Sequence, residues 1–147
     1  MRPKVFLDTN VLLDVLLPDR PFTAASLRIL DMAKKQVLEL AVTTQSLIDL
    51  YYIALRLRVK RDEIDRLVNW LCSHVNVETI DVFDLSEAVK AGTPDPEDEA
   101  QYIHSISTGC DFFLTGDKAM LQRPSSFDIR ILSPQQLLDM GQVLPAD

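Results

Sequence analysis

Near its start the chain carries the sequence KVFLDTNVLLDVLL at residues 4–17. The run Lys4–Asp8 predicts a short buried strand that ends on an acid, because continuous apolar runs are typical of strands covered on both faces. A helix is expected from Asn10 to Leu17, where Pro18 ends it. This strand, followed directly by a helix, predicts the order that the rest of the sequence should repeat.

The remaining sequence does alternate between the two patterns. Further strands are predicted at residues 38–43, 75–80, 112–115 and 129–132. Helices are predicted at residues 22–35, 47–54, 62–75, 84–90, 95–109 and 133–140. Such alternation predicts an α/β protein with a parallel sheet flanked by helices on both faces.

Length and composition limit the class of protein. At about 100–200 residues per domain, the 147 residues predict a single domain over residues 1–147, with its core at about 4–140. No apolar run approaches the roughly 18 residues of a membrane helix, so a soluble cytoplasmic protein with no membrane partner is expected. Cys72 and Cys110 form no CxxC pair, which argues against zinc and disulfides, and each is expected to be buried. The net charge of −7 provides no basic surface for nucleic acid.

Four aspartates lie where predicted strands end or where the following helices begin, which is the end of an open α/β sheet that binds ligands. They are Asp8, Asp49, Asp98 and Asp117. Each could instead cap a helix or lie in its first turn, where the helix dipole favours acids. None has a lysine or arginine three or four positions later, although surface acids on helices often do. Their shared location therefore predicts a cluster of carboxylates at one end of the sheet.

Such a cluster requires compensation for its charge. Two carboxylates about 4 Å apart repel by roughly 4 kcal/mol at an effective dielectric constant near 20. A domain has only about 5–15 kcal/mol of net stability, so it would not gather several carboxylates unaided. A divalent cation provides the compensation, and ligands that are all oxygen favour Mg²⁺ or Mn²⁺ over zinc.

Three segments of the chain resemble one family of enzymes. They are FLDTNVLLD at residues 6–14, SLIDLYY at 46–52 and PDPEDEAQYIHSISTGCDFFLTGD at 94–117. These segments are similar to the PIN-domain nucleases, particularly the small VapC-like toxins, and the resemblance spans residues 5–138. It implies a parallel sheet of about five strands. Asp8, Asp98 and Asp117 match acidic positions of the family, and Asp49 matches one that is usually Glu.

The resemblance also implies a function. It implies a Mg²⁺-dependent (or Mn²⁺-dependent) endoribonuclease that hydrolyses RNA phosphodiester bonds, with Asp8, Asp98 and Asp117 as metal ligands and Asp49 completing the catalytic set. It further implies the toxin of a toxin–antitoxin pair, a homodimer whose small antitoxin protein restrains it.

Two other functional classes stay open. A phosphatase of the haloacid-dehalogenase type also has an aspartate after its first strand. Asn10, however, occupies the place of its second aspartate, and Leu121 replaces the last aspartate of its GDxxxD motif. A non-catalytic domain that binds a metal or a partner through the same acids is the other alternative.

Four further polar residues are of a type that could support catalysis. Asn10 and Thr115 lie close to the acids in sequence, and they are expected to orient carboxylates or metal-bound water. The alternative is that Asn10 only caps a helix and that Thr115 only completes a strand. His74 and His104 have no neighbour that suggests a catalytic triad, so neither is assigned a role.

Overall fold

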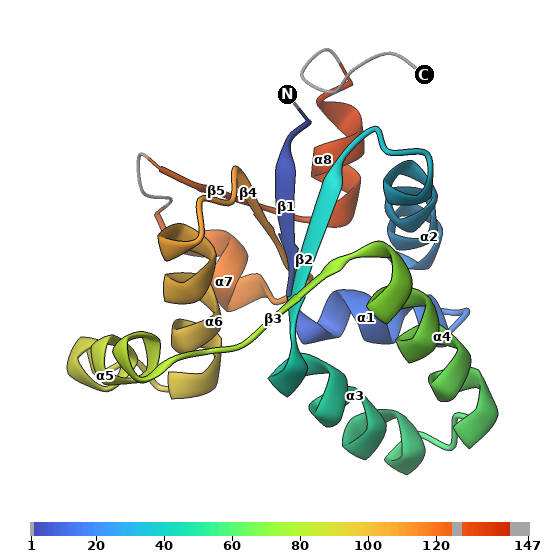
Figure 1. Cartoon of the computed structure of the whole chain (residues 1–147), viewed down its shortest axis with the longest axis horizontal. Coiled ribbons are helices and arrows are strands. Elements are labelled where there is room, and N and C mark those ends of the chain that lie inside the picture. The colour runs from blue at the N-terminus through green and yellow to red at the C-terminus, as the bar shows by residue number, and fades with distance from the viewer. Residues whose placement is uncertain (1, 125–127, 142–147) are drawn as a thin grey trace.

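Five strands form one parallel sheet whose spatial order differs from the order in the chain (Figure 1). The computed structural model describes residues 2–124 and 128–141. The strands are β1 (Lys4–Leu7), β2 (Glu39–Thr43), β3 (Asn76–Glu78), β4 (Phe112–Leu114) and β5 (Arg130–Leu132). They lie in the order β3-β2-β1-β4-β5, and every neighbouring pair is parallel. The predicted α/β fold is confirmed.

The described helices follow the predicted ones within a few residues, apart from one addition. They are α1 (Thr9–Leu16), α2 (Thr23–Lys34), α3 (Thr44–Arg56), α4 (Arg61–His74), α5 (Val82–Ala91), α6 (Pro96–Ser107), α7 (Lys118–Gln122) and α8 (Pro134–Asp139). Helix α7 was not predicted, because its five residues are too few to show an apolar repeat. Within the described ranges, no helix is long and apolar enough to cross a membrane.

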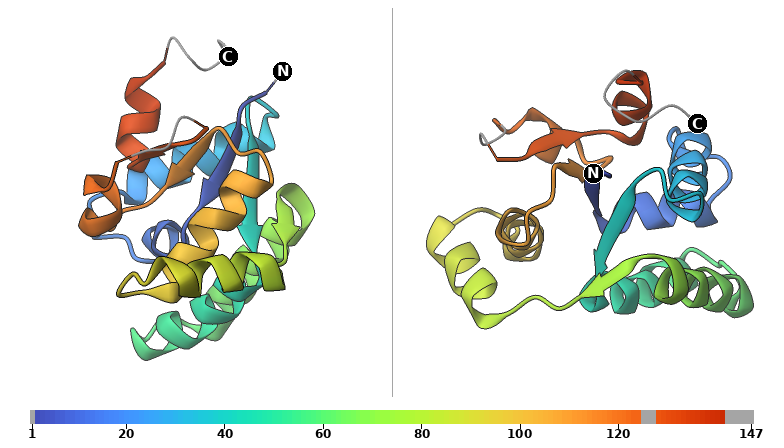
Figure 2. Two further views of the ribbon diagram at one scale, coloured as in Figure 1. Left: turned by 90° about the vertical axis from the view of Figure 1, so that its left-hand side faces the viewer. Right: turned by 45° about the horizontal axis from the view of Figure 1, so that its top comes forward.

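Helices cover both faces of the sheet, as the views in Figure 2 show. Alternate side chains of β1 enter different cores: Val5 and Leu7 face one cluster, and Phe6 faces the other. The larger core contains buried side chains of α1, α2, α3, α4 and α8. The smaller core lies against α6 and α7, where the rings of Phe6 and Phe113 stack with their centroids 5.4 Å apart.

The chain reverses its direction across the sheet after β3. It passes from β1 outward to β2 and β3, and then α5 and α6 return it to the opposite side of β1, where β4 pairs. At such a switch point the connections diverge and leave a crevice beyond the carboxyl ends of the strands. The backbone N–H of Asp8 donates to the carbonyl of Leu114 at 3.0 Å, so the residues after β1 and β4 are direct neighbours.

The two cysteines differ in their surroundings. Cys110 is buried, as expected, but the expectation for Cys72 is wrong, since its side chain is exposed on α4. The inward side of α4 is formed by Ile64, Leu67 and Leu71. Cys72 immediately follows Leu71 on a helix with 3.6 residues per turn, so its side chain points about 100° away from that of Leu71.

Candidate functional site

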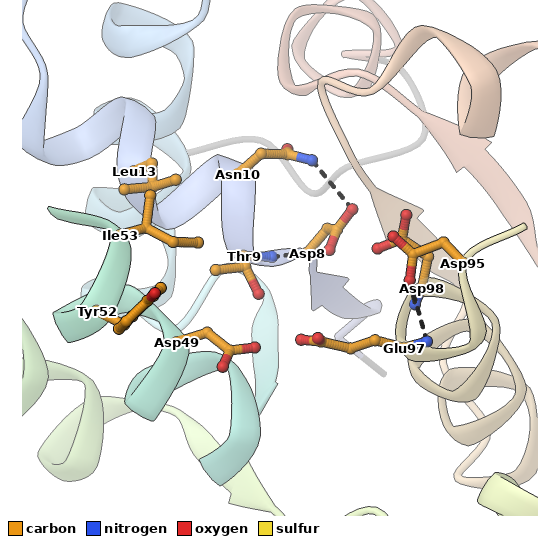
Figure 3. A pocket seen from close by; sticks show the side chains of 10 residues that line it. All are labelled: Asp8, Thr9, Asn10, Leu13, Asp49, Tyr52, Ile53, Asp95, Glu97 and Asp98. Carbon is orange, nitrogen blue, oxygen red and sulfur yellow. Dashed lines mark hydrogen bonds between the residues drawn. The ribbon is translucent and has the colours of Figure 1, made fainter. Parts of the chain in front are cut away.

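The structure places three of the four predicted aspartates around one cleft of about 450 Å³ (Figure 3). Asp8 follows β1 and caps α1, Asp49 lies in the second turn of α3, and Asp98 lies in the first turn of α6. Asp117 caps α7 and lines an adjoining cavity, which shares Asp98 with the cleft. We call the first space the acidic cleft; its acids are Asp8, Asp49, Asp95, Glu97 and Asp98.

Asp8 is the most enclosed of these acids. Only 4% of its surface is exposed. Its carboxylate accepts hydrogen bonds from the backbone of Thr9 at 2.8 Å, the amide of Asn10 at 3.0 Å and the hydroxyl of Thr115 at 2.9 Å. Burial raises the pKa of Asp8, and the hydrogen bonds oppose that rise only in part. Asp8 is therefore a fixed carboxylate that favours either a proton or a cation.

Asn10 and Thr115 join the ends of β1 and β4. The Asn10 amide nitrogen also contacts Thr115 Oγ1 at 3.1 Å, while its oxygen accepts from the Gly116 N–H at 2.7 Å. Thr115 Oγ1 in turn accepts from the Asp117 N–H at 3.0 Å. Both residues thus orient Asp8, as expected of supporting residues. The alternative in which Asn10 caps α1 is wrong, because Asp8 occupies the cap position.

Asp98 lies among other acids. Burial, followed by the charges of Asp8, Asp95 and Asp117, raises the pKa of Asp98 to about 7. The repulsion that the sequence led us to expect is therefore present at this carboxylate. No ion pair involves any of the four predicted aspartates in the part of the chain that the structure describes.

Glu97 is an acid of the cleft that our sequence reasoning missed. It extends from α6 toward Asp49 on the opposite wall, as Figure 3 shows. A hydrogen bond shared with Asp49, together with burial, raises the pKa of Glu97 to about 8. Asp95 was expected as the cap of α6 and does cap it, but its side chain also lines the cleft. Acids at four of the five positions 95–99 were the available signal.

A buried polar network joins the three helices that carry the acids. Gln101, only 1% exposed on α6, donates to Ser46 Oγ at 3.0 Å and accepts from the Thr43 hydroxyl at 3.0 Å. Thr9 at the start of α1 donates to the same Ser46 oxygen at 2.9 Å. The network fixes the relative positions of α1, α3 and α6, and with them the width of the acidic cleft.

The cleft offers the ligands of a hard cation. Its polar side chains are carboxylates, one amide and hydroxyls, which are oxygen donors of the kind that Mg²⁺ and Mn²⁺ prefer. Among the described residues, no lysine, arginine or histidine lines it. Over residues 2–124 and 128–141, no three Asp, Glu, His or Cys side chains converge closely enough to hold a metal as they stand. The donor chemistry thus fits a cation, which would favour the ionised forms of Asp98 and Glu97, whose pKa values are raised.

His104 has partners that the sequence did not reveal. It is buried on α6, where Nδ1 lies 2.8 Å from an oxygen of Asp84 and Nε2 lies 2.9 Å from an oxygen of Glu78. His104 does not line the acidic cleft, so these contacts join elements of the fold.

Comparison with known proteins identifies one protein family and two solved structures that are similar to this chain. A family model described as PIN domain matches residues 4–119. The chain is similar to VapC20 of Mycobacterium tuberculosis, a Sarcin-Ricin loop cleaving toxin, with a TM-score of 0.64 and 12% identity over 83% of this chain and 98% of that chain. It is also similar to a chain of VapBC2 from Rickettsia felis, bound to a DNA fragment from their promoter, with a TM-score of 0.60 and 14% identity over 88% and 99%. No curated protein matches.

Proposed function

This chain belongs to the PIN-domain family, and we propose from that membership that it is a metal-dependent endoribonuclease that hydrolyses RNA phosphodiester bonds in the cytoplasm. The observation that carries the proposal is the acidic cleft. Five acids from three helices line it, and the pKa values of Asp98 and Glu97 are raised to about 7 and about 8. Perturbed carboxyl groups in a cleft are typical of catalytic sites.

The proposed cofactor is Mg²⁺ or Mn²⁺, held by Asp8, Asp98 and Asp117, with Asp49 completing the catalytic set. A divalent cation at this place would offset the carboxylate charges and activate water for an in-line attack on phosphorus. The chain's own residues supply the orientation: Asn10 and Thr115 hold the Asp8 carboxylate in one position. We add Glu97 to this set, because it shares a hydrogen bond with Asp49.

We further propose that the protein is the toxin of a toxin–antitoxin pair. VapC20, which is named as a toxin, and one chain of the VapBC2 structure have the same fold as this chain, which supports the analogy. An antitoxin that places an arginine against Asp8, Asp98 or Asp117 would satisfy the uncompensated carboxylates, because the guanidinium can bind a carboxylate at two points.

A homodimer is the proposed assembly. Large apolar side chains are exposed on α3 and α5, which both lie at the lower end of the molecule in Figure 1. The starts of the two helices also border a common cavity. The most exposed of these side chains are Ile48, Tyr52, Val82, Phe83 and Val89. Exposed apolar side chains of this kind favour contact with a second copy.

The alternatives are less well supported. In a haloacid-dehalogenase-type phosphatase, a second aspartate would occupy position 10, but here the Asn10 amide holds both Asp8 and the Gly116 N–H. A non-catalytic binding domain would also use the acids. It is distinguished by binding Mn²⁺ without hydrolysing any RNA.

The test is an RNA cleavage assay with Mg²⁺ or Mn²⁺ and with excess EDTA. We expect cleavage that EDTA abolishes, and a loss of about 100-fold or more in Asp8→Asn, since even the loss of an outer contact to a metal ligand costs about 10–100-fold. Asp19→Asn removes an exposed carboxylate from a turn and should retain full activity. Cleavage that persists in EDTA, or full activity in a folded Asp8→Asn protein, would contradict the proposal.

A further inference from the structure

A second cavity, of about 480 Å³, adjoins the acidic cleft on the side of α7. Asp95 and Asp98 line both spaces, so the acids lie at the border between them. Its volume falls within the roughly 300–1,000 Å³ of small-molecule sites. We call it the Arg123 cavity, after the one cation among the described residues that line the two spaces.

The guanidinium of Arg123 is held rigidly at this cavity. Its Nη1 and Nη2 donate to the two oxygens of Glu99 at 2.7 and 2.9 Å. Its Cζ lies 4.4 Å from the ring centroid of Tyr102. Glu99 and Tyr102 are 3% and 4% exposed, whereas the side chain of Arg123 retains 32% of its exposure. The arginine is therefore fixed from behind and accessible from the cavity.

This arrangement leaves Arg123 able to bind an anion. A guanidinium has five N–H groups, and two of them bind Glu99, so three remain. An arginine that is already ordered loses little conformational entropy when it binds a ligand. Thr93 and the acids Asp95, Asp98 and Asp117 also line the cavity. Its apolar part consists of Pro94, Ala119 and Met120, which suits the face of a base.

A purely structural explanation of this ion pair is weak. Buried ion pairs contribute little net stability compared with apolar residues of similar volume. Here the pair fixes the five-residue helix α7 to α6, a task that apolar contacts could perform. The ion pair also keeps hydrogen-bond donors at a border lined by Asp95 and Asp98, where the proposed metal ion would offset the carboxylate charges and Arg123 would donate to a phosphate.

We propose that the Arg123 cavity binds the nucleotide that neighbours the scissile phosphate of a single-stranded RNA, with Arg123 contacting its phosphate and Pro94, Ala119 and Met120 contacting its base. The inference rests on the proposed function and extends it, since it assigns a subsite and a substrate class. Arg123 acts here as a binding residue and does not touch the reacting atoms.

The experiment measures RNA affinity as a function of length, without cleavage. Fluorescently labelled oligouridylates of about two to six nucleotides are titrated into Asp8→Asn, which has all residues of the Arg123 cavity. We expect one step in the series, where the added nucleotide reaches the cavity, to raise affinity by about tenfold. Adding Arg123→Gln should abolish that step, and Arg123→Lys should restore part of it.

Two further variants keep the test decisive. Ala119→Leu fills the cavity from an exposed position and leaves the ion pair with Glu99 intact, so it should abolish the same step even if Arg123→Gln does not fold. Arg28→Gln removes an exposed arginine from α2 and should leave the step unchanged. An unchanged step in both Arg123→Gln and Ala119→Leu would overturn the inference. Failure of the wild type to cleave RNA would instead overturn the proposed function, and the binding series would still decide the subsite.

Discussion

At the scale of single residues, Asp98 and Glu97 favour the protonated form when no cation is bound and the ionised form when a cation is bound. Asp98 is crowded by Asp8, Asp95 and Asp117, and Glu97 shares a proton-dependent hydrogen bond with Asp49. Without a cation, protons provide the compensation that the carboxylates need. With a cation the same groups are expected to ionise, so cation binding should release protons.

This predicts that the metal-free protein becomes less stable as pH rises. The folded-state pKa values of Asp98 and Glu97, about 7 and about 8, lie above their ordinary values of 3.8 and 4.5. Between about pH 4 and pH 8 the folded protein therefore holds more protons than the unfolded protein, and its unfolding free energy falls as pH rises. The midpoint of urea unfolding in EDTA should be lower at pH 9 than at pH 5.

Two variants and a metal check the origin of that slope. Asp98→Asn removes a titrating group and should flatten the pH dependence, whereas Asp19→Asn should match the wild type. Mg²⁺ should restore stability at pH 9 more than at pH 5. A slope that is equally steep in Asp98→Asn would contradict the assignment.

Residue patterns predicted the four aspartates because each follows a strand or opens a helix, which is a local property. They did not predict Glu97, because its importance comes from Asp49 on a different helix. The same reasoning applies to Arg123, whose partner Glu99 is 24 positions away. Whether Asp8, Asp49, Asp98 and Asp117 act in catalysis stays a prediction.

At the scale of elements, α6 connects the site to the rest of the fold. Its first turn carries Glu97 and Asp98, its middle carries Gln101, and its third turn carries His104. His104 joins α6 to α5 through Asp84 and to the end of β3 through Glu78. Both ring nitrogens of His104 thus lie within hydrogen-bond distance of a carboxylate oxygen, so one side chain connects three elements of the fold.

We predict that His104→Gln destabilises the protein by about 1–3 kcal/mol, since it removes hydrogen bonds that His104 makes at a buried position. Urea unfolding at pH 7 measures the effect. His74→Gln is the matched control, because His74 is exposed at the end of α4, where its ring stacks on Trp70 at 4.4 Å between centroids and its Nδ1 lies 2.9 Å from the Trp70 carbonyl oxygen. Equal stability of the two variants would show that the contacts of His104 contribute nothing.

Apolar periodicity predicted the strands and most helices within a few residues, because a buried face leaves a repeat in the sequence. It could not predict α7, nor the partners of His104, which lie 20 and 26 positions away. It also could not predict the exposure of Cys72, since a cysteine fits either side of a helix.

At the scale of the whole molecule, a net charge of −7 opposes self-association, so a dimer must depend on apolar contact. The exposed side chains of α3 and α5 are the available surface. The prediction of one domain over residues 1–147 stays a prediction, and its last residues, 142–147, lie outside the described part of the chain.

We predict that Phe83→Asp and Val89→Asp each convert a dimer to a monomer, because a carboxylate cannot be buried unpaired at an apolar contact. Their side chains are 59% and 66% exposed, so the isolated fold should be unaffected. Light scattering after gel filtration measures the mass, and thermal melting measures the fold. Leu27→Asp, at an exposed position on α2, is the control. A wild-type monomer at all concentrations would refute the dimer.

The pairing of β1 with β4 has a consequence for synthesis of the protein. Asp8 leaves the ribosome early, but Thr115, which orients it, follows 107 residues later. Local helices can form sooner, while contacts between such distant segments must await both partners. A nascent chain therefore has Asp8 and Asp49 long before it has β4 and α7, and the Asp8 carboxylate gains the hydroxyl group that orients it only once Thr115 has been synthesised.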